Sequence, residues 1–513
     1  MLIKAAHRRA LAGFAALALS SLAVWPVRAA AQQMPPTLAS TTYERLDPIF
    51  AEFQRENHIP GLVYGIVADG RLVHVRAFGV QDVKARRPVT PDSLFRIASM
   101  TKAFTALAIL SLRDRGRLSL DMPVDAYVPE LKDWRYPTSD SPRIRVRDLL
   151  NHSAGFVTDD PWGDRQTPMP EAAFTTLLRT GVPFTRAPGL QMEYSNFGYA
   201  LLGRVVANVS GQPYRTYVER TLLRPLDMRS SGFEVTEWPI ERRAIGYRWE
   251  NDAWTEEPTM RHGAFGAMGG LQVSANDYAR YVAWLLSAWP SRDGADVGPV
   301  KRATVRELTQ GSNFAGRQER ILDGRPCPQA VAYGMGMRVF TDCELGTALN
   351  HGGGYPGYGS GVLLLPDHGV GLFVFSNRTY AGGSDALWRA ASMLNEAGLL
   401  HERALPVSAA LNEAYAAARA IYRDDDALAF RDKLAGNFLL DRSAANWRRE
   451  LAAIKGRVGA CERDRPIYAR GALSANFRWL CDRGMVDGYL LLAPTTPITI
   501  QQLRLTVAPP PPS

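Results

Sequence analysis

The chain has 513 residues, of which 46% are hydrophobic and 22% are charged, and its formal net charge is +9. These are ordinary values for a globular protein, and the length allows for two to four domains. The positive charge is small for this length and the basic residues are not clustered in runs, which argues against a nucleic-acid-binding protein.

Residues 1–31 have the order of a secretory signal peptide. Arg8 and Arg9 precede an apolar run from Leu11 to Val24, and small residues follow before an expected cleavage after Ala31. The run is too short to span a bilayer, and the paired arginines leave both the general and the twin-arginine export routes open. We therefore expect a periplasmic or secreted protein with no stable membrane anchor. Removal of the four positive charges reduces the formal net charge from +9 to about +5.

The region from 32 to 400 predicts an α+β domain whose strands come from both ends and whose helices come from the middle. An amphipathic helix leads into a strand pair around the turn at Asp69 and Gly70. The middle contains helical patterns interrupted by proline and glycine. One of these follows Ser274, with Asp277 in the position of a capping-box partner.

Strands return near the end of this region, at residues 333–340 and in two apolar runs within 361–377. A helix from Asp385 to Leu399 is expected to cover them. This order of elements predicts an antiparallel sheet covered by helices, with an all-helical subdomain.

A second unit follows a linker at residues 401–406. Residues 407–507 begin with an alanine-rich helical segment and end in four strand-like runs, which predicts a small α+β domain of unknown role. The proline-rich tail at 508–513 is expected to be disordered.

Four cysteines remain after the signal peptide, and an even number in an exported protein indicates disulfides. Three pairings are possible. We expect Cys327–Cys343 and Cys461–Cys481, because each closes a short loop. Four free buried thiols are the alternative.

A lysine lies at the start of a segment that otherwise has the composition of a buried helix. From Ala103 to Leu112 only Thr105 and Ser111 are polar. Lys102 directly precedes this run, and Ser99 lies three residues earlier, on the same face of a helix. Burial lowers the pKa of a lysine, which would allow it to take the proton of a serine nucleophile. The alternative is a chance spacing, with the ammonium reaching solvent from the helix end.

Two further segments contain candidate site residues. Tyr194 and Asn196 come just before a helical pattern, and the alternative for them is a buried tyrosine with a capping asparagine. His351 precedes Gly352, Gly353 and Gly354 next to the apolar strand pair. Glycines there would let a substrate approach an edge of the sheet closely. The alternative is a flexible turn with a surface histidine.

Taken in order, these segments resemble the serine β-lactamase and penicillin-binding-protein superfamily. They are most similar to its branch of class C β-lactamases, D-alanyl-D-alanine carboxypeptidases, D-aminopeptidases and esterases. The resemblance covers roughly residues 40 to 400. It rests on the segments FRIASMTKAFTALAI, VRDLLNHSAGF, PGLQMEYSNFGYALLGRVV, MGGLQVSANDYARY and HGGGYPGYGSGVLLLPDHGVGLFVFSN.

The resemblance implies a role for each candidate. Ser99 would be the acylated nucleophile, Lys102 its base, and Tyr194 the group that passes the proton to the leaving group. Asn196 would bind Lys102 or a substrate carbonyl, and His351 would occupy the third-motif position on the strand beside the site.

The resemblance also implies an oxyanion hole and a substrate-binding strand. The backbone N–H groups of Ser99 and Gly354 would stabilise the developing charge, and Gly352 and Gly353 would lie along the substrate.

Two motifs depart from those of the best-known family members. The Tyr194 segment is Tyr-x-Asn rather than Ser-Asp-Asn, and the third motif is His-Gly-Gly rather than Lys-Thr-Gly. With an ordinary pKa near 6.5, only about a tenth of His351 would be charged at pH 7.5. A neutral imidazole binds a carboxylate without charge assistance, which argues against efficient β-lactam hydrolysis.

The sequence therefore predicts an exported serine hydrolase that acts on small esters or D-amino-acid peptides. Its substrate would be a small molecule or a peptide such as one derived from peptidoglycan. The alternatives are a true class C-like β-lactamase, and a penicillin- or peptidoglycan-binding sensor with negligible turnover. His152 and His262 lie in no metal-binding or hydrolase-elbow motif, so no metal and no cofactor are expected.

Overall fold

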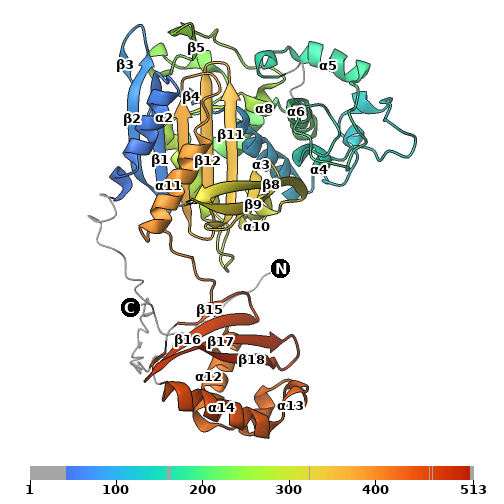
Figure 1. The fold of residues 1–513 in the computed structure, drawn as a ribbon. Helices are drawn as coiled ribbons and strands as arrows, with labels where there is room; N and C mark the ends of the chain where they lie inside the picture. The colour runs from blue at the N-terminus through green and yellow to red at the C-terminus, as the bar shows by residue number, and fades with distance from the viewer. Residues whose placement is uncertain (1–41, 159–162, 323, 462, 465, 509–513) are drawn as a thin grey trace, which may run out of the picture.

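The computed structural model describes residues 42–158, 163–322, 324–461, 463–464 and 466–508 (Figure 1). The predicted signal peptide, and all but the first residue of the predicted tail, lie outside this part of the chain. Within it there are two main sheets, of nine and five strands, each with its own helices and hydrophobic core.

The larger sheet is antiparallel, with the strand order β3-β2-β1-β13-β12-β11-β10-β9-β8. Its N-terminal strands pair with its C-terminal ones through β1 and β13, as the sequence predicts. The strands are β1 (Gly61–Ala68), β2 (Arg71–Asp82), β3 (Arg87–Pro88), β8 (Asn313–Leu322), β9 (Arg325–Tyr333), β10 (Arg338–Asp342), β11 (Gly346–Tyr355), β12 (Tyr358–Leu365) and β13 (Val370–Ser376).

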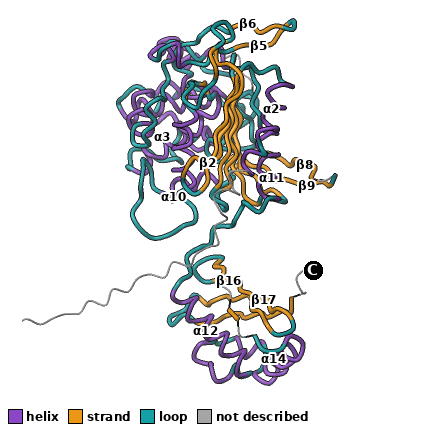
Figure 2. The backbone as a smooth tube through the Cα atoms, turned by 90° about the vertical axis from the view of Figure 1, so that its left-hand side faces the viewer, coloured by secondary structure: helices purple, strands orange, loops and turns teal. Residues whose placement is uncertain are grey.

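Helices cover both faces of this sheet, which Figure 2 shows nearly edge-on. One face is covered by α2 (Asp47–Glu56) and α11 (Ser384–Glu396). The other carries α3 and the helical subdomain. The helices on this face are α3 (Thr101–Asp114), α4 (Val146–Leu150), α5 (Glu171–Thr180), α6 (Asn196–Ser210), α7 (Tyr214–Val218), α8 (Gly266–Gly269), α9 (Ala275–Leu286) and α10 (Arg302–Arg306). The same region contains two short strand pairs, β4 (Phe95–Arg96) with β7 (Gln272–Val273) and β5 (Tyr247–Glu250) with β6 (Ala253–Glu256).

The helix α3 lies at the centre of the larger core. All residues from Thr101 to Leu112 are buried, including Lys102. Phe104 stacks on Tyr281 of α9, with ring centroids 4.1 Å apart. The segment is apolar because α3 is buried on all sides until its last turn, as the sequence predicts.

The predicted strand at 333–340 is wrong in one respect. β9 ends at Tyr333 and β10 begins at Arg338, with a turn between them. Gly336 has a φ of +79°, and a Cβ there would lie 2.7 Å from the carbonyl oxygen of Lys102. The glycine therefore allows this turn to pack directly on α3. The β8 strand was not expected, because its exposed edge is mostly polar and gives no apolar pattern.

The C-terminal sheet domain confirms the expected small α+β unit. β16, β17 and β18 form a meander, β14 and β15 pair with β16, and Trp479 and Leu490 are buried against the helices. Its elements are α12 (Ala409–Asp424), α13 (Phe438–Asp441), α14 (Ala444–Val458), β14 (Arg463–Asp464), β15 (Tyr468–Ala469), β16 (Ser474–Cys481), β17 (Gly484–Ala493) and β18 (Thr499–Ala508).

Both expected disulfides are confirmed. Cys327 pairs with Cys343 next to the β9–β10 pair, and Cys461 pairs with Cys481 at the end of β16. Among the described residues no helix is both long and apolar enough to cross a bilayer.

Arg403, in the predicted linker, is held by the larger domain. Its guanidinium donates to the carbonyl oxygens of Leu286, Trp289 and Gly369, at 3.0, 3.1 and 3.3 Å. Two residues later, Leu405 bridges to Ala469 of the C-terminal sheet. Because Arg403 bonds to the larger domain and Leu405 to the C-terminal sheet, the boundary between the two domains lies just after Arg403.

A chain that ends at Ala404 should therefore fold and retain the activity of the full chain on small esters. A matched chain that ends at Leu400 loses the three partly buried hydrogen bonds of Arg403 and should be less stable by about 2–3 kcal/mol. Thermal unfolding and ester kinetics of the two chains test this. Aggregation of both truncated chains would show that the C-terminal domain completes the larger core.

Candidate active site

Ser99 lies on a strained turn at the start of α3. It belongs to a 3-10 turn, Ala98–Met100, that runs directly into the helix, and Ala98 has a φ of +49°. A left-handed conformation is uncommon for alanine and costs free energy that the surroundings must offset. Two hydrogen bonds fix Ile97 just before it, from its own N–H to Leu271 O (3.0 Å) and from the Ser360 hydroxyl to its carbonyl oxygen (2.7 Å).

The amino group of Lys102 is held by three oxygen atoms. Nζ lies 3.1 Å from Ser99 Oγ, 2.8 Å from Asn196 Oδ1 and 2.8 Å from the carbonyl oxygen of Met268. The lysine is fully buried, while Ser99 is partly exposed. These contacts come from the nucleophile turn, α6 and α8, so three elements converge on one nitrogen.

This arrangement suits the lysine in both protonation states. The oxygens of Asn196 and Met268 can only accept, so each takes one N–H of Lys102. The remaining position faces Ser99 Oγ. An ammonium donates its third proton there, whereas a neutral amine offers its lone pair to the serine O–H. Proton transfer between Ser99 and Lys102 therefore needs no rearrangement of the other two bonds.

Tyr194 and Asn196 are placed by the start of α6. Asn196 is the first residue of this helix, and the hydroxyl of Ser195 caps it by accepting from Gly198 N at 3.2 Å. The ring of half-buried Tyr194 lies 4.8 Å from Lys102 Nζ. Tyr194, Asn196, Lys102 and Ser99 are thus brought together as the motifs predict.

The glycine run of β11 lies against the nucleophile turn. A Cβ at Gly353 would collide with the Ser360 hydroxyl and the carbonyl oxygen of Ile97. A Cβ at Gly354 would collide with the ring of Tyr380. Gly352 is exposed. Because Gly353 has no side chain, β11 can lie against the Ser99 turn.

His351 is buried, with both ring nitrogens engaged by the protein. Nδ1 lies 2.6 Å from the carbonyl oxygen of Gly352, and since only a donor can bond there, it carries the proton. Nε2 then accepts from the hydroxyl of Tyr333 at 2.9 Å. Burial, with a smaller contribution from Lys102, lowers the pKa of His351 to about 3. The imidazole is neutral over the whole physiological range, further from charging than an ordinary histidine would be.

The chain matches the Beta-lactamase family over residues 46–394, about two thirds of its length. The chain belongs to the beta-lactamase family. It is 28% identical to "Protein flp" of Staphylococcus aureus (strain COL) over 381 residues, 73% of this chain and 70% of that protein. It is 34% identical to "Esterase EstB" of Burkholderia gladioli over 237 residues, 44% of this chain and 59% of that protein.

Solved structures share the fold. A class C beta-lactamase has a TM-score of 0.55 at 20% identity and covers 69% of this chain and 96% of its own. The octameric penicillin-binding protein homologue from Pyrococcus abyssi has a TM-score of 0.56 at 22% identity and covers 91% of this chain and 99% of its own. The match to the Pyrococcus abyssi protein covers 91% of this chain, whereas the family match covers only residues 46–394. The structural match therefore extends into the C-terminal sheet domain.

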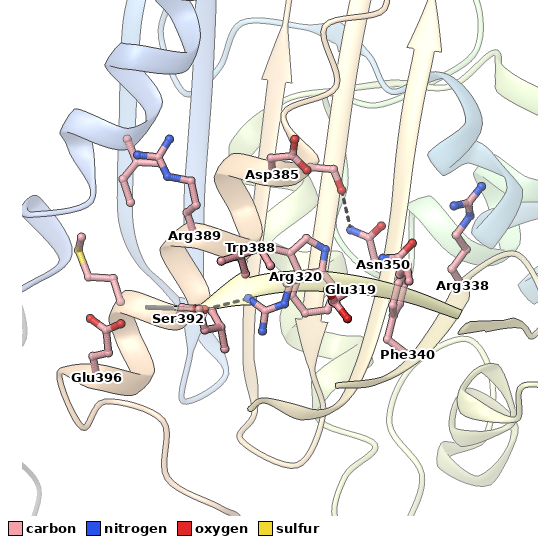
Figure 3. A pocket seen from close by; sticks show the side chains of 16 residues that line it. Glu319, Arg320, Arg338, Phe340, Asn350, Asp385, Trp388, Arg389, Ser392 and Glu396 are labelled. Carbon is pink, nitrogen blue, oxygen red and sulfur yellow. Dashed lines mark hydrogen bonds between the residues drawn. The ribbon is translucent and has the colours of Figure 1, made fainter. Parts of the chain in front are cut away.

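A separate cavity, shown in Figure 3, lies outside the Ser99 site. It has a volume of about 760 Å³ and lies between α11 and β8. Asn350 lines it, and successive side chains of β11 point to opposite faces, so it is on the far side of the sheet from His351. Arg320 in its wall is paired with Asp342 at 2.8 Å and stacks on Trp388. The charge of Arg320 is thus paired within the protein.

Sequence reasoning missed several residues of the site. Met268 contributes only a carbonyl oxygen, which no side-chain pattern reveals. Ser360 was hidden within an apolar strand. His152 lay in a recognised family segment, but its contact with Tyr194 requires the fold. Among the described residues the cluster of possible metal ligands is Cys327, Asp342 and Cys343, and both thiols are disulfide-bonded.

The buried histidines should make stability depend on pH. Burial lowers the pKa of His351 to about 3 and that of His262 to about 4, whereas both have a pKa near 6.5 when unfolded. Between the folded and the unfolded pKa values, the unfolded chain binds more protons than the folded one. The contribution of these histidines to the free energy of unfolding is therefore full well above pH 6.5 and decreases as the pH falls below it. From pH 7.5 to 5.5 each histidine should cost about 1.4 kcal/mol.

Denaturant unfolding at the two pH values measures this loss. His262→Asn should reduce the pH dependence by the share of one histidine. An unfolding midpoint that stays constant from pH 7.5 to 5.5 would contradict the prediction.

Proposed function

We propose that the protein is an exported serine hydrolase that forms an acyl-enzyme on Ser99. It cleaves ester or amide bonds, and it favours small esters or D-amino-acid peptides over β-lactams. The observation that carries this proposal is the 3.1 Å contact between Ser99 Oγ and Lys102 Nζ, in a lysine held on its other sides by Asn196 and Met268. The similarity to a protein named as an esterase supports the choice of ester substrates.

The chemistry follows from these positions. Ser99 Oγ attacks the substrate carbonyl carbon as its proton passes to the neutral amine of Lys102. The backbone N–H groups of Ser99 and Gly354 donate to the oxyanion. Tyr194, beside Lys102, gives a proton to the leaving alcohol or amine, and the lysine proton replaces it. Water then attacks the acyl-enzyme by the reverse proton path and releases the acid and Ser99.

The preference against β-lactams rests on His351. A cation at this position would hold a substrate carboxylate by a charge-assisted hydrogen bond. The imidazole here is neutral, and its nitrogens are engaged by Tyr333 and Gly352 O. A carboxylate-bearing substrate would therefore find no cation at this place.

Ser99→Ala should abolish turnover and covalent labelling by a fluorophosphonate while the protein stays folded, because only Oγ is lost. Lys102→Arg should reduce kcat by about 10²-fold or more, since arginine keeps the charge but cannot give up its proton. Near wild-type kcat in Lys102→Arg would show that Lys102 is not the base. Labelling of the wild type without turnover would instead support a binding or sensor protein.

The ratio of kcat/KM for nitrocefin to that for a short-chain p-nitrophenyl ester should be low and constant from pH 5.5 to 8.5. The reason is that the pKa of His351, about 3, lies below this range. An ordinary histidine would become charged towards pH 5.5 and raise the ratio there. Efficient nitrocefin hydrolysis at pH 8 would restore the class C-like β-lactamase alternative.

A further inference from the structure

His152 lies beside the catalytic groups but has no part in the mechanism above. It lies two residues after the end of α4, is 2% exposed, and has a φ of +60°. A histidine in this left-handed conformation is uncommon, and the cost of the conformation must be offset by the contacts that it makes.

Two backbone groups that flank Tyr194 donate to this one residue. The N–H of Glu193 donates to the carbonyl oxygen of His152 at 2.8 Å. The N–H of Ser195 donates to Nδ1 of His152 at 3.1 Å. The residues on both sides of Tyr194, Glu193 and Ser195, are therefore each held by a hydrogen bond to His152.

The side chains are also in contact. The ring centroids of His152 and Tyr194 are 4.3 Å apart, with an angle of 38° between the rings. The same tyrosine ring lies 4.8 Å from Lys102 Nζ. Because the backbone on both sides and the ring itself are constrained, the phenol has little freedom to move relative to Ser99 and Lys102.

The hydrogen bond from Ser195 also determines the state of the imidazole. Nδ1 must accept, so the neutral ring carries its proton on Nε2. Nε2 is buried and has no hydrogen-bond partner among the described residues. Burial, followed by the charge of Lys102, holds the pKa of His152 well below its usual value. A proton on Nδ1 would face the Ser195 N–H and break that hydrogen bond.

We propose that His152 is the positioning residue of Tyr194: it holds the chain on both sides of the tyrosine through its carbonyl oxygen and Nδ1, and its ring supports the phenol ring by direct contact. The role rests on the proposed function, in which Tyr194 transfers the proton to the leaving group. A catalytic group displaced by about 1 Å loses on the order of 10²-fold in rate. The side chain of His152 should thus affect kcat much more than KM.

Two substitutions separate the acceptor from the bulk of the side chain. Asparagine and glycine both tolerate a positive φ. His152→Asn keeps an oxygen near the place of Nδ1, whereas His152→Gly removes the acceptor and the ring. We expect His152→Gly to lower kcat by about 10²-fold with little change in KM, and His152→Asn to regain most of that loss.

A double-mutant cycle with Tyr194→Phe tests whether His152 acts through the tyrosine hydroxyl. If it does, His152→Gly should cost little further activity in the Tyr194→Phe background. Equal losses in His152→Asn and His152→Gly, or an undiminished loss in the Tyr194→Phe background, would overturn the proposal.

Amide hydrogen exchange provides a readout that does not depend on turnover. The Ser195 amide should exchange faster in His152→Gly than in the wild type, and His152→Asn should restore its protection. Unchanged protection in His152→Gly would overturn the hydrogen bond on which the proposal stands. Absence of turnover and labelling in the wild type would overturn the proposed function instead, whatever the exchange rates show.

Discussion

The structure of the site depends on the burial of the amino group of Lys102. Removing an amine from water is costly unless its protons are paired, and here three oxygens surround Nζ. They come from three separate elements, so the lysine satisfies its hydrogen bonds only when the Ser99 turn, α6 and α8 are all in place. The same requirement that offsets the cost of burial thus brings Ser99 Oγ beside Lys102 Nζ.

The nucleophile turn shows how the sheet supports this arrangement. The left-handed conformation of Ala98 presents Ser99 at the start of α3, and it persists because the preceding residue, Ile97, is bonded to Leu271 and Ser360. The bond from Ser360 requires β12 to lie close by, and the neighbouring strand can approach only because Gly353 has no side chain. The strained conformation of Ala98 therefore depends on the absence of a side chain at Gly353.

The features of the fold and the site that depend on residues close together in the sequence were predictable. The spacing of Ser99 and Lys102, the capping position of Ser274 and the short loops of the two disulfides all depend on nearby residues. The oxygen of Met268 was not predictable, because every residue has a carbonyl group and only the fold selects this one. The turn after Tyr333 was missed because its reason, the packing of Gly336 on α3, lies in a distant part of the chain.

The pKa values of the buried histidines also could not be predicted from the sequence. An ordinary pKa was the natural assumption for His351, and burial beside Lys102 lowers it far below that value. The pKa of His152 is lowered by the same two causes in the same order. A charged imidazole would compete with the lysine for the few acceptors and repel it, so both rings act as neutral hydrogen-bonding groups that fix neighbouring backbone. Burial beside Lys102 therefore keeps positive charge off β11 at His351. Under the proposed function, the reactivity of Ser99 and a weak affinity for carboxylates would then have one physical origin.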